Sequence, residues 1–163
     1  MSELPSSPAC ERNKNPILEV LKDYFTYGDV LEIGHGSAQH AEYFSQNLPV
    51  RWHPTDIGEN LWMAQERLKS GGTFEAPKAL RVSPEKSLKS QLKRSFDHIF
   101  SANTLHIMSE DLAFRLCDQV GEVLNSGGQL VLYGPFKWEG KFTSQSNEIF
   151  DQSLKESHPQ MGI

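Results

Sequence analysis

Apolar side chains recur at helical spacing in the first ordered-looking stretch of the chain. Ile17, Leu18, Leu21, Tyr24 and Phe25 predict an amphipathic helix over 16–26, because residues three and four apart share one helix face. Asn15 can cap this helix and Pro16 suits its first position. The short apolar run 29–34 that follows predicts a strand entering a glycine-rich turn.

The same alternation continues to the end of the chain. Apolar positions predict further helices at 39–47, 60–69, 111–124 and 144–156, and strands at 50–55, 79–82, 96–102 and 128–133, while the polar segment 84–93 fits a helix or a loop. Strands that alternate with helices indicate parallel pairing through right-handed crossovers. We therefore expect an open, mostly parallel, doubly wound α/β sheet in a single domain over 15–163, preceded by a flexible arm at 1–14.

Glycines follow the first predicted strand, and a carboxylate follows the second. Gly34 and Gly36 permit a tight strand-to-helix turn that a ligand can approach closely, and Asp56 lies where a ribose diol is held in such folds. A dinucleotide would also require glycine at the position of Gln39, and a pyrophosphate would be repelled by Glu32. S-adenosylmethionine carries an ammonium and a sulfonium, which a carboxylate favours. A glycine turn without any ligand is the simpler alternative.

Four segments extend this pattern into a resemblance. The segment around the glycine loop, VLEIGHGSAQHAEYF, resembles motif I of class I S-adenosylmethionine-dependent methyltransferases. Together with ERNKNPILEVL, FSANTLHIM and LYGPFKWEGKFTSQSNEIFDQSL, it resembles the methyltransferase-like 26 family over residues 11–163. The resemblance implies a Rossmann-like methyltransferase fold, with S-adenosylmethionine at the tips of the first, second and fourth strands, and leaves the methyl acceptor open between a small molecule and a protein.

The resemblance also implies a set of site residues at the strand tips. The residues expected to bind the cofactor are Glu32, Gly34, Gly36, Ser37, Asp56, Ile57, Ser83 and Asn103. Three positions depart from the usual pattern: Ala38 stands where glycine is frequent, His35 could crowd the cofactor, and Ser83 replaces an aspartate that would bind the adenine amino group.

Two further polar residues are candidates for the reaction itself. Asn103 follows the fourth predicted strand and could orient the reacting groups, although an Asn there can also simply complete a turn. His106 could take a proton from the acceptor, because imidazole titrates near neutral pH, or it could merely begin a helix. Glu11, Arg12 and Asn13 fit either a lid over the cofactor or a solvated turn.

Charge and composition narrow the setting. A formal net charge of -5 disfavours a binder of nucleic acid or of anionic membranes. Cys10 and Cys117 match neither a zinc spacing nor a disulfide framework, and no apolar stretch reaches the length of a membrane span or a signal core. We expect no metal and an intracellular, cytoplasmic setting.

The end of the chain bears on the resemblance. Methyltransferases of this class carry an antiparallel hairpin beside the fifth strand, and no such hairpin is evident after residue 133. The sequence therefore predicts a C-terminally truncated fold with an exposed sheet edge, through which two copies could pair. A non-catalytic interaction module that retains the fold is the alternative to an enzyme.

Overall fold

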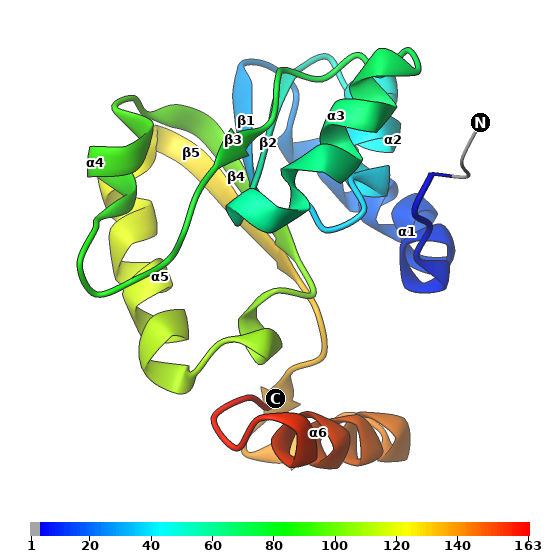
Figure 1. Cartoon of the computed structure of the whole chain (residues 1–163), viewed down its shortest axis with the longest axis vertical. Coiled ribbons are helices and arrows are strands. Elements are labelled where there is room, and N and C mark those ends of the chain that lie inside the picture. The colour runs from blue at the N-terminus through cyan, green and yellow to red at the C-terminus, as the bar shows by residue number, and fades with distance from the viewer. Residues whose placement is uncertain (1–3) are drawn as a thin grey trace.

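A five-stranded parallel sheet forms the centre of the molecule. The computed structural model (Figure 1) describes residues 4–163. The strand order is β3-β2-β1-β4-β5. The strands are β1 (Asp29–Ile33), β2 (Arg51–Asp56), β3 (Lys78–Ala79), β4 (Phe96–Ala102) and β5 (Leu124–Tyr133). The order reverses on either side of β1, so the predicted doubly wound sheet is confirmed.

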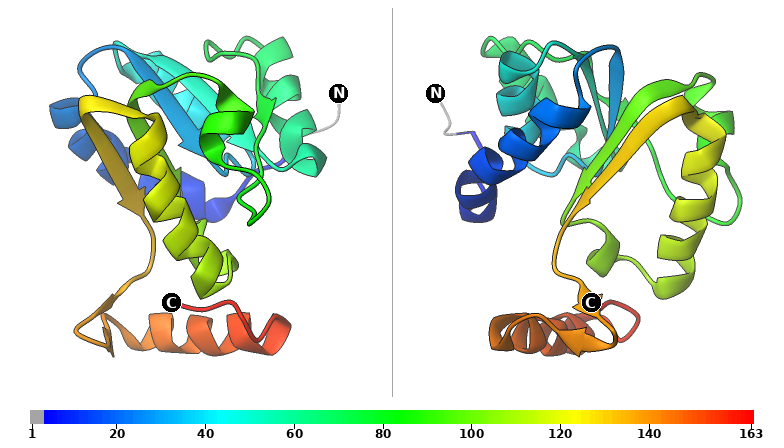
Figure 2. Two further views of the ribbon diagram at one scale, coloured as in Figure 1. Left: turned by 90° about the vertical axis from the view of Figure 1, so that its left-hand side faces the viewer. Right: turned by 180° about the vertical axis from the view of Figure 1, so that it is seen from behind.

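Helices cover both faces of this sheet (Figure 2). One face carries α1 (Pro8–Tyr24), α2 (Gln39–Asn47) and α3 (Leu61–Lys69), and the other carries α4 (Leu88–Leu92) and α5 (Glu110–Val123). All five residues of β1 are buried, with Val30 in the first core cluster and Leu31 and Ile33 in the second. This alternation follows from a strand that is covered on both sides.

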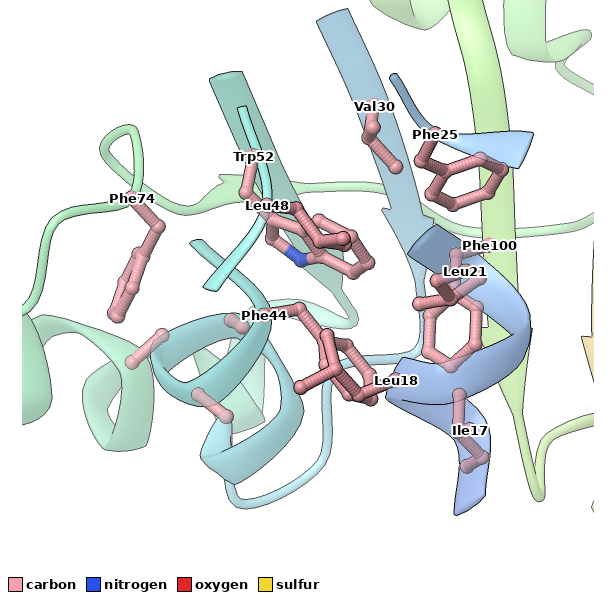
Figure 3. Close-up of a cluster of buried hydrophobic side chains, with 13 residues drawn as sticks. Ile17, Leu18, Leu21, Phe25, Val30, Phe44, Leu48, Trp52, Phe74 and Phe100 are labelled. Atoms are coloured by element: carbon pink, nitrogen blue, oxygen red, sulfur yellow. The ribbon is translucent and has the colours of Figure 1, made fainter. Parts of the chain in front are cut away.

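Aromatic rings fill the core under α1 and α2 (Figure 3). Trp52 of β2 lies against Phe44 of α2 and Phe100 of β4, with ring centroids 5.4 and 5.5 Å apart, and none of the three rings is exposed. Such close contacts fix α2 on the sheet, so the loop that leads into α2 is held at the carboxyl end of β1.

The first helix begins earlier than the sequence predicts. Pro8, not Pro16, takes the first helical turn, so residues 8–14 are helical rather than part of a flexible arm, and residues 1–3 of that predicted arm lie outside the described residues. Pro16 lies inside the helix, where it offers no N–H to the preceding turn. Polar contacts with α2 stabilise the extra turns: Glu11 Oε1 accepts from Gln39, and His40 Nε2 lies 2.8 Å from Asn13 Oδ1.

The last strand also begins earlier than expected. Helix α5 ends at Val123 and β5 starts at Leu124, before the glycine pair. Phe96 pairs with Leu124 and His98 with Gln129, so β5 carries a bulge across residues 125–128. Gly128 allows it, because a Cβ there would lie 2.4 Å from the Asp97 carbonyl oxygen.

The C-terminal segment crosses below the strand tips rather than joining the sheet (Figures 1 and 2). β6 (Lys137–Trp138) and β7 (Lys141–Phe142) pair antiparallel with each other in a separate two-stranded sheet, and α6 (Gln145–Ser157) follows as predicted. Within residues 4–163, no strand pairs with the outer edge of β5.

Candidate functional site

A cleft of about 990 Å³ opens at the carboxyl ends of the strands. Its walls are the loops after β1, β2, β4 and β5, the first turns of α1, the segment after β3, and α6. The volume is that of a small-molecule site. Its position is the one where ligands bind in open α/β sheets, beside the reversal of strand order.

The loop after β1 approaches the cleft with its backbone. Gly34 and Gly36 both have positive φ angles, 78° and 53°, but for different reasons. A Cβ on Gly34 would lie 2.5 Å from Thr104 Oγ1, whereas a Cβ on Gly36 would meet no atom within 4 Å. Gly34 thus permits close packing of two loops, and Gly36 leaves open space in the cleft wall.

Asp56 ends β2 and faces this loop. Its Oδ2 accepts the Gly36 N–H at 2.8 Å, and its Oδ1 accepts from the backbone N–H of Ile57 and the side chain of Asn60, at 2.7 and 2.9 Å. These three bonds use three of the roughly four acceptor positions of a carboxylate. The predicted residues Gly34, Gly36, Asp56 and Ile57 therefore come together on one wall of the cleft, with Ser37 beside them.

The loop after β4 brings Asn103 and His106 to the same space. Asn103 has a φ of 55° and donates its N–H to the Tyr133 carbonyl, which holds it beside β5. A Cβ on Gly134 would lie 3.8 Å from His106 Nδ1 and 3.9 Å from Asn103 Oδ1, so both polar side chains flank one small volume. Phe150 of α6 meets the His106 ring edge-on at 5.3 Å. Burial lowers the pKa of His106, which keeps its imidazole neutral at neutral pH.

Glu32 does not line the cleft, contrary to the prediction that it contacts the cofactor. Its side chain lies in the core, 1% exposed, and its Oε2 accepts from Trp52 Nε1 at 2.7 Å. Burial raises the pKa of Glu32 to about 8, against the opposing effect of the Trp52 bond and with a small contribution from the charge of Asp56. A protonated, buried acid supports the loop from below and offers no charge to a ligand's ammonium.

Ser83 also lies outside the cleft lining. The chain after β3 turns so that Leu80, Arg81 and Val82 reach the cleft instead. The prediction that Ser83 contacts the cofactor is therefore not supported, and the apolar side chains of Ile57, Leu80 and Val82 line this part of the cleft.

His35 and Ala38 are accommodated in the loop. His35 lines the cleft but is 4% exposed, and its Nδ1 donates to the Gly36 carbonyl at 2.9 Å, while Nε2 is buried without a hydrogen-bond partner among residues 4–163. Burial lowers the pKa of His35. Ala38 adopts a φ of 58°, the conformation that glycine would take without strain.

Several cleft residues come from segments that the sequence did not connect to the site. Ser7, Ala9 and Cys10 reach it from the start of α1, and Asn147, Phe150 and Gln160 reach it from α6 and the segment after it. Arg12 also lines the cleft, and it belongs to the segment 11–13 that the sequence left open between a lid and a solvated turn. No periodicity or spacing reports such contacts, because they depend on how distant helices lie across the strand tips.

The described part of the chain has neither a cluster of metal-binding side chains nor a helix that could span a membrane. No three His, Cys, Asp or Glu side chains between residues 4 and 163 are placed to hold a metal ion. Over the same range, no helix combines the length and the hydropathy that crossing a membrane requires.

Comparison with solved structures identifies the fold. An O-methyltransferase family protein from Burkholderia thailandensis superimposes with a TM-score of 0.73 at 13% identity, over 95% of this chain and 48% of that one. Human N-acetylserotonin methyltransferase in complex with SAM gives 0.67 at 16%, over 90% and 40%, and the YcgJ protein from Bacillus subtilis gives 0.62 at 19%, over 93% and 61%. The chain has the class I methyltransferase fold and spans about half the length of the first of these proteins.

The family is defined by sequence. The family described as "Protein of unknown function (DUF938)" matches residues 4–163, nearly the whole chain. The chain belongs to this family.

Proposed function

We propose that the protein is an S-adenosylmethionine-dependent methyltransferase. The observation that carries the proposal is the pairing, in one cleft, of the open glycine loop at Gly36 with the carboxylate of Asp56. The fold supports it, since the similar structures include O-methyltransferases and one methyltransferase in complex with SAM. The narrower resemblance to the methyltransferase-like 26 family stays our prediction from the sequence segments.

The cleft residues fit the parts of this cofactor. Asp56 has one free acceptor position for a ribose hydroxyl, and a second hydroxyl could replace the Asn60 amide. The surface of Ile57, Leu80 and Val82 suits the flat face of an adenine. The backbone from Gly34 to Ser37 leaves room for the methionine part. When bound, the cofactor supplies a methyl group already activated on a sulfonium, so the protein mainly has to align the acceptor and exclude water.

Asn103 and His106 are placed to act on the acceptor. Both flank the small volume next to Gly134, at the tips of β4 and β5. We assign Asn103 to orienting the acceptor, and His106 to accepting its proton through the free imidazole nitrogen. A neutral imidazole can do so at neutral pH, which agrees with the lowered pKa. The walls near His106 are Ile107, Met108, Tyr133 and Phe150 together with amides, so this side of the cleft carries no formal charge.

A non-catalytic binding module is the second candidate. It is favoured by the outer edge of β5, which is unpaired within residues 4–163, and by the exposed aromatic ring of Trp138 in β6, which is 76% exposed. This candidate predicts that partners bind outside the cleft and that no methyl transfer occurs.

Cofactor binding separates these functions. S-adenosylhomocysteine, the demethylated product, should raise the melting temperature with increasing concentration, because it binds only the folded state. NADH should leave the melting temperature unchanged. A shift with NADH alone would assign the cleft to a dinucleotide, and no shift with either ligand would favour the binding module.

A further inference from the structure

Few charged side chains line the cleft, and they differ in whether they have a hydrogen-bond or ion-pair partner. Among residues 4–163, the lining contains three formally charged side chains, Arg12, Asp56 and Arg81. Arg81 lies 3.7 Å from Glu59, and Asp56 accepts three hydrogen bonds. Arg12 is exposed and has neither an ion pair nor a side-chain hydrogen bond within the described residues. A guanidinium facing a cleft without a carboxylate partner is available to an anionic group of a ligand.

The two sequence neighbours of Arg12 hold its backbone in place. On one side, Glu11 Oε1 accepts from Gln39 Nε2 at 2.7 Å, and on the other, the buried Asn13 contacts His40 at 2.8 Å. Both partners lie in the first turn of α2, directly after the glycine loop. Arg12 is therefore held beside this loop by its two neighbours in sequence.

The neighbouring charges leave Arg12 unopposed. The carboxylate of Glu11 pairs with Lys14 at 2.5 Å and accepts a hydrogen bond from Gln39 of α2, so both of its oxygens already have partners. Glu32, behind the loop, is buried and has a raised pKa, and the carboxylate of Asp56 already accepts three hydrogen bonds. The N-terminus of α2 adds a small positive potential at the same place.

Asp56 and Arg12 lie on different elements that border the same loop, Asp56 at the end of β2 and Arg12 on α1. A ligand whose ribose is bound by Asp56 and whose chain runs along Gly34–Ser37 would direct its far end toward α1. We propose that Arg12 binds the carboxylate at the amino-acid end of S-adenosylmethionine. This inference rests on the proposed function and assigns a binding role to the N-terminal helix.

A thermodynamic cycle tests the assignment. The ligands are S-adenosylhomocysteine and S-adenosyl-3-thiopropylamine, which differs from it only in lacking the carboxylate. The proteins are the wild type, Arg12→Ala and Arg12→Lys, and titration calorimetry measures each affinity. Lys22→Ala is the matched control, because Lys22 is an exposed cation of the same helix, is paired with Glu19 and lies outside the cleft lining.

The expected result is a coupled loss. Arg12→Ala should weaken S-adenosylhomocysteine binding by about 10- to 150-fold, the range for a hydrogen bond to a charged group. It should leave binding of the amine unchanged, while Arg12→Lys should lose less and Lys22→Ala nothing. Since Arg12 is exposed, the melting temperature of the free variant should stay at the wild-type value.

Three outcomes would overturn the assignment of Arg12 and leave the proposed function standing. An unchanged affinity of Arg12→Ala for S-adenosylhomocysteine would show that Arg12 does not contact this ligand. Equal losses for both ligands would mean that Arg12 acts through the adenosine end or through packing of α1. A wild type that binds both ligands equally would show that no group recognises the carboxylate. If the wild type binds S-adenosylhomocysteine not at all, the proposed function fails along with this inference.

Discussion

The same substitution should affect the two glycines of the loop after β1 differently, with stability the main loss at Gly34 and ligand binding the main loss at Gly36. In Gly34→Ala the new Cβ would lie 2.5 Å from Thr104 Oγ1 and 2.9 Å from its Cγ2. Thr104 is 8% exposed and its hydroxyl contacts the Ala102 carbonyl at 3.1 Å, so it cannot move away freely. In Gly36→Ala the new Cβ would meet nothing within 4 Å and would occupy open space in the cleft.

The magnitudes follow from these contacts. Both substitutions place alanine at a positive φ, which costs about 1–2 kcal/mol. Overpacking adds about 1–3 kcal/mol to Gly34→Ala only. We therefore expect the free energy of unfolding to fall by about 2–5 kcal/mol in Gly34→Ala and by about 1–2 kcal/mol in Gly36→Ala. Ligand affinity should fall more in Gly36→Ala than in Gly34→Ala, because the added methyl group at Gly36 takes the space assigned to the cofactor.

Urea denaturation and titration with S-adenosylhomocysteine measure the two effects separately. Combining Gly34→Ala with Thr104→Ala should recover part of the lost stability, because the atoms that clash are removed, with a coupling of about 0.5–3 kcal/mol. Equal destabilisation by the two glycine variants would contradict the packing argument. Wild-type affinity in a folded Gly36→Ala protein would contradict the assignment of this space to the ligand.

Four further predictions follow from the same structure. Asp56→Ala should weaken S-adenosylhomocysteine binding by about 1.5–3 kcal/mol while the protein stays folded, and calorimetry showing an unchanged affinity would mean that Asp56 does not face the ribose. Glu32 has a folded pKa of about 8, raised from 4.5, so its contribution to stability is complete below pH 4.5 and is lost as the pH rises to 8. Urea denaturation should therefore show Glu32→Gln gaining stability relative to the wild type between pH 6 and pH 9. An equal stability difference at the two pH values would rule this out. Burial lowers the folded pKa of His40 from 6.5 to about 4, so its contribution to the free energy of unfolding is complete above pH 6.5 and falls by up to about 3 kcal/mol as the pH drops toward 4. His40→Gln should lose less stability over that interval. Identical pH profiles of the variant and the wild type would exclude His40 as the cause. The unpaired edge of β5, with the uncharged run 127–134, should associate with a second copy of the chain, which light scattering would show as a mass that rises with concentration, whereas a monomer at every concentration would refute this.

Local pattern determined the elements and the place of the site. The helix at 39–47 and the strand at 96–102 have the predicted bounds, and β1 ends one residue before the predicted run 29–34, because each is a short segment whose periodicity is set by what it buries. Gly34, Gly36 and Asp56 were predicted to lie together because parallel strands bring their carboxyl ends to one edge, and they do.

Contacts between distant segments decided the rest. Pro16 resembles a helix start by itself, yet the helix begins at Pro8, because contacts of Glu11 and Asn13 with α2 stabilise turns that the local sequence does not favour. Glu32 fits a ligand contact by spacing, but strand alternation turns its side chain into the core, where Trp52 supplies the hydrogen bond. The guanidinium of Arg12 at the cleft, and the ring of Phe150 against His106, depend on how α1 and α6 cross the strand tips. Packing over such distances is absent from local periodicity, so only the tertiary structure determined which side chains share the cleft.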